Sequence, residues 1–175
     1  MRFEGRDYVS AFLLTTQINE RWYNGPHMEK QWEIKTVADL KPLVSSILDT
    51  LTKNRSNGEA IVLALHGELG AGKTTFMQIL AKELGVVETV TSPTFVVMKN
   101  YSLEESVWER LVHIDAYRIE DTDEMRPLGF VELLQEPKNL ICIEWAEKIA
   151  DLLPPSTLHL HFTITGETRK VTING

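Results

Sequence analysis

The sequence predicts an α/β fold with a mostly parallel sheet, helices on both faces and an antiparallel hairpin at the C-terminus. Short apolar runs that suit buried strands are followed by segments of helical periodicity, as in parallel sheets covered by helices. Near the end of the chain, apolar and polar residues alternate over 158–164 and again over 171–173, on either side of Gly166. This alternation predicts the closing hairpin.

Size and composition indicate one ordinary globular domain. The chain has 175 residues, of which 43% are hydrophobic and 25% charged, and domains commonly contain about 100 to 200 residues. The longest apolar run, from Ala60 to Leu65, is far below the roughly 18 to 20 residues that cross a bilayer. The single cysteine, Cys142, forms no internal disulfide, and the N-terminus lacks a secretory signal pattern. We therefore expect a cytoplasmic protein without a membrane span.

The net charge of −7 argues against a primary role in binding DNA or RNA directly. Nucleic-acid affinity depends mainly on Lys and Arg side chains that neutralise phosphates. Any contact with RNA is therefore expected to be indirect, through a basic partner.

We expect residues 1–30 to be an N-terminal extension and residues 31–175 to form the domain. The first 27 residues are rich in aromatic side chains without a clear period, and they end at Gly25-Pro26, just before Met28. Three interpretations are open: a peripheral extension, a gene start placed too early, or a segment that docks on the domain or a partner.

The first predicted helix follows Thr36, because apolar residues spaced by three and four continue to Leu51. Either Thr36 caps a short first turn, or the regular helix starts at Pro42. A loop at Asn57-Gly58 precedes a predicted strand over 61–65. The next helix ends at Gly85. Further strands are predicted over 95–98, 111–114 and 140–143, with short helices near residues 124 and 133.

Residues 67–74, GELGAGKT, match the pattern G-x-x-x-x-G-K-[ST] and lie between a predicted strand and a predicted helix. Glycines let backbone N–H groups surround phosphate oxygens, and the helix presents its positive end to the same anion. Lys73 is expected to reach the β and γ phosphates, Thr74 to bind magnesium, and Thr75 to contact the α or β phosphate. The alternative is a glycine-rich turn, but a lysine beside a helix N-terminus is unfavourable without an anion. The predicted nucleotide-binding residues here are Gly67, Glu68, Leu69, Gly70, Ala71, Gly72, Lys73, Thr74 and Thr75.

Two carboxylates, Asp115 and Glu144, stand at the ends of predicted strands, where such a loop needs a metal-supporting group. We assign magnesium binding and water activation to Glu144. Asp115 is a candidate for the metal shell or for a switch that senses the γ phosphate. Together with Lys73 and Thr74 they form the predicted catalytic and metal-binding set. Each carboxylate taken alone is also compatible with a solvated residue at a strand exit.

Other residues have open roles. Arg118 follows Asp115 by three positions and either stabilises phosphoryl charge or forms a local salt bridge. Trp145 is a buried anchor, a ring near the nucleotide or a partner contact. Thr94 lies in the hydroxyl-rich segment 91–95, which is either a loop that closes on the γ phosphate or an ordinary turn. His113 is expected to pack in or beside the sheet.

Four ordered motifs resemble those of the TsaE-type ATPases of bacterial threonylcarbamoyladenosine tRNA modification: the loop with Thr75, Ser92-Pro93-Thr94-Phe95, His113-Ile114-Asp115-Ala116-Tyr117-Arg118, and Ile143-Glu144-Trp145. The resemblance covers roughly Glu33 to the C-terminus. The first 27 residues and the long connection over 103–110 depart from the pattern.

The resemblance implies a cytoplasmic, magnesium-dependent ATPase that binds a TsaD–TsaB heterodimer and does not itself transfer threonylcarbamoyl to tRNA. Its hydrolysis would reset the complex and would be weak without these partners. It also implies that Ser92 to Phe95 form a nucleotide-sensing switch, that Asp115 and Glu144 are functional, and that Trp145 belongs to the site region.

Two alternatives share the phosphate loop. A small-molecule kinase needs an arginine-bearing lid, and the sequence has no arginine cluster to build one. A nucleotide-dependent binding module that recruits partners with little hydrolysis stays open. A GTPase is disfavoured, because the guanine motif N-K-x-D and the switch motif D-x-x-G are both absent.

Overall fold

The computed structural model describes residues 30–53 and 58–174. The predicted N-terminal extension lies outside the described residues except for Lys30, where the first strand begins. Within these ranges, no helix has the length and apolar character needed to cross a membrane.

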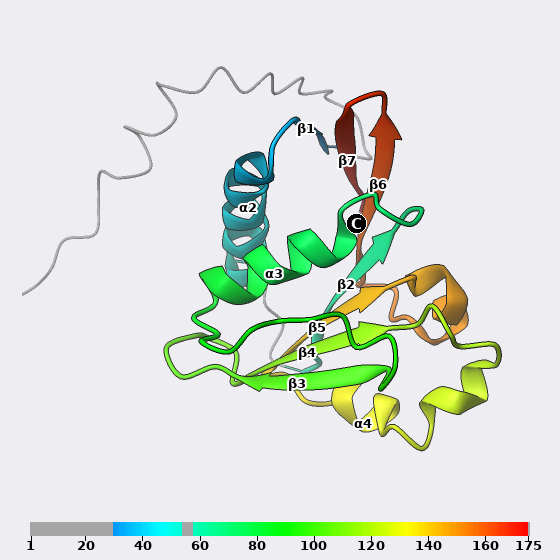
Figure 1. Ribbon diagram of the computed structural model, residues 1–175. Coiled ribbons are helices and arrows are strands. Elements are labelled where there is room, and N and C mark those ends of the chain that lie inside the picture. Colours follow the sequence, from blue (N-terminus) through cyan, green and yellow to red (C-terminus); the bar gives the residue numbers. More distant parts are fainter. Residues whose placement is uncertain (1–29, 54–57, 175) are drawn as a thin grey trace, which may run out of the picture.

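The described residues form a seven-stranded sheet flanked by short helices (Figure 1). The strands are β1 (Lys30–Ile34), β2 (Ile61–His66), β3 (Met98–Ser102), β4 (Arg110–Asp115), β5 (Asn139–Glu144), β6 (Leu158–Thr165) and β7 (Thr168–Asn174). The α-helices are α2 (Leu40–Lys53), α3 (Lys73–Glu83) and α4 (Phe130–Leu134). Single 3-10 helices occur at η1 (Val37–Asp39), η2 (Thr122–Met125) and η3 (Ala146–Leu152).

The sheet is parallel at its centre and antiparallel at both edges. Its order is β1-β7-β6-β2-β5-β4-β3, and the pairs β6–β2, β2–β5 and β5–β4 are parallel. Beyond β6, β7 and then β1 add antiparallel strands at one edge, and β3 pairs antiparallel with β4 at the other edge. The predicted α/β fold with a parallel centre and a C-terminal hairpin is confirmed.

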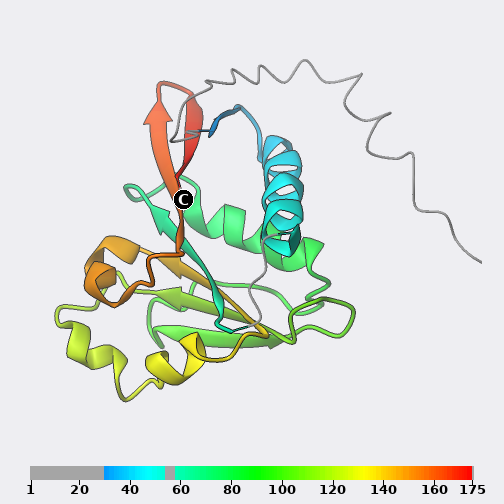
Figure 2. The same ribbon diagram turned by 180° about the vertical axis from the view of Figure 1, so that it is seen from behind.

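Side chains that alternate across the central strands create two apolar cores. Leu63 and Leu140 face α2 and α3 on one side of the sheet, whereas Val62 and Ile141 face α4, η2 and η3 on the other (Figure 2). Full burial of one such aliphatic side chain contributes about 1.5–3 kcal/mol. Helices therefore cover both faces, as predicted.

The start of the first helical segment resolves one open alternative. Thr36 is an extended N-cap residue, and the carboxylate of Asp39 accepts hydrogen bonds from the backbone N–H groups of Lys35, at 2.9 Å, and Thr36, at 2.7 Å. A 3-10 turn follows, and α2 begins at Leu40 rather than at Pro42. Proline is tolerated there, because first-turn N–H groups need no partner within the helix.

The strand predicted over 95–98 is wrong in position. The N–H groups of Val96 and Val97 both donate to the carbonyl of Pro93, at 2.8 and 2.6 Å, which closes a turn. Val97 also has a φ of 64°, outside the strand region. The β-branched residues that suggested a strand therefore belong to a turn, and β3 begins only at Met98. Strand β1 and the 3-10 helix η3 were not predicted from the sequence.

Three parallel strands end together at one edge of the sheet. In the ladder, Leu65 of β2 pairs with Glu144 of β5, and Glu144 pairs with Asp115 of β4. The chain leaves β2 at this edge, turns through residues 67–72 and enters α3 (Figure 1). The predicted phosphate loop and both predicted carboxylates consequently lie at the same place.

The turn after β2 requires glycine at its first position. Gly67 has a φ of 134°, and a Cβ at this residue would lie 2.3 Å from the carbonyl oxygen of Phe162 on β6. Real Cβ atoms do not approach backbone oxygens so closely. A side chain here would push the loop away from the neighbouring strand.

We expect Gly67→Ala to lower the free energy of unfolding by at least about 2 kcal/mol, because a strained backbone conformation alone costs on the order of 1–3 kcal/mol. Urea unfolding at neutral pH would measure the change. Gly58→Ala is the control, since a Cβ there meets nothing within 4 Å and should change stability by less than about 0.5 kcal/mol. Equal stability of the two variants would contradict the close approach.

Candidate functional site

Three polar side chains interrupt the apolar pattern of β4 and β5 on the face that α3 covers. His113 and Asp115 are two positions apart on β4, and Glu144 ends β5 beside Asp115. Because side chains alternate along a strand, all three share the face of buried Leu111 and Cys142. Their exposed fractions are 0% for His113, 4% for Asp115 and 2% for Glu144. These groups are therefore shielded from bulk water.

The loop over 67–72 is built to present main-chain groups. Gly67, Gly70 and Gly72 have φ values of 134°, 79° and 107°, a region that glycine enters without steric cost. Gly72 is also the N-cap residue of α3 and supplies no side-chain cap. The first N–H groups of an α-helix lack partners within the helix, so this end of α3 can receive an anion.

Lys73 holds a buried ammonium group at the centre of the loop. Its Nζ donates to the carbonyls of Gly67, at 2.5 Å, and Glu68, at 3.0 Å, and lies 3.9 Å from the centroid of a Trp145 ring. Burial lowers the pKa of Lys73, an effect that Glu144 and nearby carboxylates oppose. The ammonium is thus surrounded by acceptors that an anionic ligand can replace.

Both carboxylate oxygens of Glu144 accept hydrogen bonds from side chains of other elements. The hydroxyl of Thr74, in the first turn of α3, donates to Oε2 at 2.7 Å. Nε2 of His113 on β4 lies 2.9 Å from Oε1. Since an ionised carboxylate only accepts, Nε2 of His113 carries the proton in this contact. Glu144 is therefore fixed between helix and sheet.

Asp115 connects the sheet to the hydroxyl-rich segment. Its Oδ2 accepts from the hydroxyls of Ser92, at 2.7 Å, and Thr94, at 2.5 Å, and its Oδ1 accepts from the N–H of Tyr117 at 3.1 Å. The segment 91–95 thus does more than connect α3 to β3, because its hydroxyls bind a buried carboxylate.

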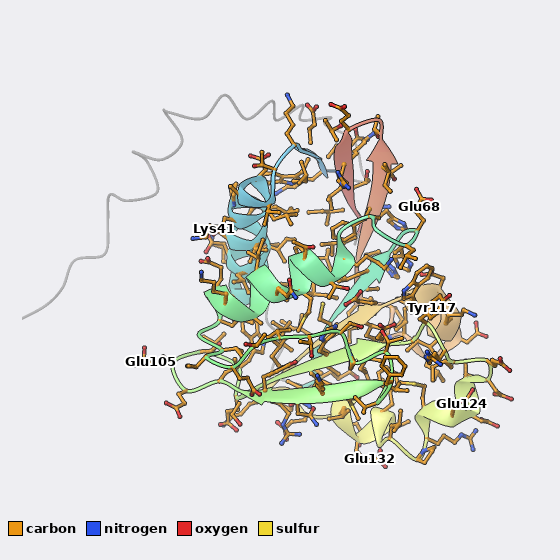
Figure 3. All side chains as sticks on the ribbon, viewed as in Figure 1. Lys41, Glu68, Glu105, Tyr117, Glu124 and Glu132 are labelled. Atoms are coloured by element: carbon orange, nitrogen blue, oxygen red, sulfur yellow. The ribbon has the colours of Figure 1, made fainter. Side chains whose placement is uncertain are left out.

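These residues enclose one cleft with a volume of about 430 Å³. Figure 3 labels Glu68 on the outer part of the loop and Tyr117 on the same side of the molecule. Ten of the predicted site residues contribute to the lining, together with Ser92 and Tyr117: Leu69, Gly70, Gly72, Lys73, Thr74, Thr75, Thr94, Asp115, Glu144 and Trp145.

Four predicted residues have other positions. Gly67 and Glu68 contribute carbonyls to Lys73 rather than cleft surface. Ala71 lines a neighbouring cavity. The guanidinium of Arg118 lies 4.8 Å from the centroid of the exposed Phe95 ring, and Arg118 is not among the residues that line the cleft.

The neighbouring cavity has a volume of about 240 Å³ and lies on the other side of the same loop. Thr75 and the glycines at 70 and 72 line both spaces. The rest of its wall comes from the start of the first helical segment and from the hairpin: Ile34, Lys35, Thr36, Val37, Leu40, Phe162, Arg169 and Val171. The loop therefore contributes to the walls of both spaces.

Three residues of the site region have contacts that the sequence did not predict in full. Ser92 was predicted only as part of the switch segment Ser92 to Phe95, and Tyr117 was assigned no role. Both line the cleft, and Tyr117 packs against Trp145 with ring centroids 5.1 Å apart. His113 was expected only to pack in or beside the sheet. The sequence did contain one signal for a role of His113 in the site. His113 and Asp115 are two positions apart on a predicted strand, and this spacing places both side chains on the same face.

Comparisons with known proteins point to one family. A family model described as threonylcarbamoyl adenosine biosynthesis protein TsaE matches residues 34–171. A Borreliella burgdorferi protein described as tRNA threonylcarbamoyladenosine biosynthesis protein TsaE is 34% identical over 65% of this chain and 81% of its own length. Proteins of the same description from Bacillus subtilis and Streptomyces coelicolor are each 38% identical, over 62% and 71% of this chain and 65% and 85% of their own lengths.

A solved structure shows the same likeness. The crystal structure of Bacillus subtilis YdiB superposes with a TM-score of 0.65 and 26% sequence identity, and the match covers 86% of this chain and 88% of that one. The predicted resemblance is confirmed by the family match, which extends over most of the chain. This chain belongs to the TsaE family of threonylcarbamoyl adenosine biosynthesis proteins.

Proposed function

We propose that this protein binds ATP with Mg²⁺ in the cleft beside the glycine loop and hydrolyses it as an accessory subunit in the formation of threonylcarbamoyladenosine in tRNA. One observation carries the proposal: the cleft gathers the glycine loop, buried Lys73, the Thr74 hydroxyl and two buried carboxylates. Phosphoryl transfer depends on positioning and charge neutralisation, which these groups supply.

The loop fits a polyphosphate. Lys73 already directs its ammonium at two carbonyls of the loop, and a phosphate oxygen is a stronger acceptor for it than a neutral carbonyl. The positive end of α3 and the backbone N–H groups of the glycine turns add further donors. Thr75 lines the cleft beside them and is positioned for the α or β phosphate.

The oxygen atoms of Thr74, Glu144 and Asp115 fit Mg²⁺, which prefers oxygen ligands and is usually held by one or two carboxylates plus substrate phosphates. Among the described residues, no group of three or more His, Cys, Asp or Glu is placed to hold a metal ion without a substrate. The bound ion would neutralise charge on the phosphate oxygens.

Glu144 is the group we assign to orienting and deprotonating the attacking water. Its carboxylate is buried and fixed at both oxygens, which gives it a defined direction in the cleft. Asp115, bonded to Ser92 and Thr94, is the group we assign to sensing the nucleotide. A change at the phosphate end of the cleft would reach the segment 91–95 through these hydroxyls.

The neighbouring cavity, whose wall includes Val37, Ala71 and Phe162, is the place we assign to the nucleoside. Thr75 lines both spaces, so a nucleotide whose phosphates occupy the cleft would extend its base over Ala71 toward Val37 and Phe162. Apolar surface suits the faces of a purine ring. ATP rather than GTP is proposed because the guanine motif is absent from the sequence.

The proposed role of this protein in tRNA modification is supported by the names of its relatives. TsaD and TsaB are the partners that we propose. We also propose that tRNA is contacted indirectly, since the net charge of −7 disfavours direct binding to RNA. Hydrolysis that is weak alone and rises with these subunits would fit an accessory role.

Lys73→Ala should weaken ATP binding about ten- to a hundredfold, since a lost charge-assisted hydrogen bond costs about 1.5–3 kcal/mol. Titration with a fluorescent ATP analogue measures the affinity. Lys82→Ala, which removes an exposed lysine from the same helix, is the matched control. Unchanged affinity in Lys73→Ala would remove Lys73 from the phosphate site.

Glu144→Ala should keep much of the nucleotide affinity and lose turnover by about a hundredfold or more, because general base catalysis contributes roughly 10²–10⁴ in rate. Exposed Glu88 offers the control Glu88→Ala. Both variants should be compared by steady-state hydrolysis and by nucleotide titration. Full turnover by Glu144→Ala would move water activation to another residue.

The proposed function itself is tested by ATP hydrolysis of the purified protein, alone and with TsaD and TsaB from the same source. Turnover that rises with the pair and requires Mg²⁺ supports a partner-activated ATPase. Firm ATP binding without turnover in either setting would instead support the binding module that recruits partners through its nucleotide state.

A further inference from the structure

His113 occupies a position where an apolar residue would be expected. It is 0% exposed, on a strand whose neighbours Leu111, Val112 and Ile114 are also completely buried. Its Nδ1 is buried without a hydrogen-bond partner among the described residues. A buried polar group that is only half satisfied is unfavourable compared with an apolar one. Packing alone therefore does not account for an imidazole here.

Among the described residues, the His113 ring makes one polar contact, with the carboxylate of Glu144. Nε2 and Oε1 are 2.9 Å apart, within the ordinary range of an N–H···O bond. The two residues lie on neighbouring parallel strands and face the same side of the sheet. Both are almost completely buried, so water does not compete for this bond.

The contact divides the two oxygens of Glu144 between two partners. Oε2 accepts from Thr74, which lies in the cleft lining, whereas Oε1 accepts from His113, which does not belong to that lining. The terminal torsion of a glutamate has broad, roughly two-fold preferences and so does not fix the carboxylate plane by itself. A donor behind the carboxylate fixes that plane and leaves the other oxygen directed at the cleft.

We propose that His113 is a positioning residue for hydrolysis, which donates Nε2–H to Oε1 of Glu144 and thereby holds Oε2 toward the reacting groups. The proposal rests on the proposed ATPase function. When the Thr74 hydroxyl turns to a ligand, its bond to Oε2 is given up, and the bond from His113 is the one that still orients the carboxylate. His113 itself touches neither substrate nor metal ion.

The test compares His113→Leu, which fills similar volume without a donor, with His113→Gln, whose side-chain amide can place an N–H near the position of Nε2. Loss of a group that orients a functional ligand commonly costs about 10–100-fold in activity. At saturating Mg²⁺, we expect His113→Leu to lower kcat about 10–100-fold with a KM for ATP within about twofold of wild type. His113→Gln should recover most of kcat.

Val112→Ala is the matched control for lost packing. Val112 is equally buried on the same strand but belongs to the core on the opposite face of the sheet. This variant should lose stability in urea unfolding and keep kcat. A kcat loss in Val112→Ala as large as in His113→Leu, or unchanged kcat in a folded His113→Leu, would overturn the positioning role.

A second readout separates this proposal from the proposed function. If wild type with its partners does not turn over ATP, the ATPase proposal fails, and the Mg²⁺ dependence of nucleotide affinity then decides the role of His113. A loss of about tenfold in Mg²⁺ affinity in His113→Leu, restored in His113→Gln, supports positioning of Glu144. Equal Mg²⁺ dependence in wild type and His113→Leu would overturn it.

Discussion

Parallel pairing of β2, β5 and β4 brings the ends of three strands to one level at one edge of the sheet. The ladder aligns Leu65 with Glu144 and Glu144 with Asp115, so the loop that leaves β2 meets both carboxylates. A register shift of one residue would turn these carboxylates into the opposite apolar core, because side chains alternate along a strand. On its other side β2 pairs in parallel with β6, and the close approach of Gly67 to the carbonyl of Phe162 depends on that pair. The cleft is thus a consequence of how the sheet is ordered.

The energetics of burial explain why the site residues bond to one another. Moving an ionised group from water into the protein interior costs several kcal/mol if the group gains no partner there. Removing one partner of a buried charged pair costs about 3–5 kcal/mol. Lys73, Asp115 and Glu144 each have at least two polar partners in the structure. These partners come from the loop, α3, β4 and the segment 91–95, so the contacts that satisfy the buried charges also join separate elements around the cleft. In the proposed ATP-bound state, phosphate and cation would compete for these same contacts, so binding of the ligand would change the hydrogen bonds that hold segment 91–95.

Local patterns predicted much of the fold and of the site. The glycine turn after β2, strand β2, helix α3, the two strands that end in carboxylates and the closing hairpin were all predicted correctly as structure, because each depends on turn residues or on a periodicity within a few positions. The strand over 95–98 was misplaced, since the hydrogen bonds to Pro93 outweigh the β propensity of Val96 and Val97. The five-residue strand β1 was missed because its antiparallel pairing with β7 joins distant parts of the chain. The position of Arg118 over Phe95 also has no local signal.

The sequence by itself determined the family, the type of fold and the chemistry available: a glycine loop with a lysine, a hydroxyl and two carboxylates at strand ends. Only the tertiary structure decided which groups meet. The bond between His113 and Glu144 joins residues 31 positions apart, and the bond between Thr74 and Glu144 joins residues 70 positions apart. Strand periodicity fixes the face on which a side chain lies, but the order of strands in the sheet fixes its neighbour. That order is set by packing of the whole chain, which no short segment encodes.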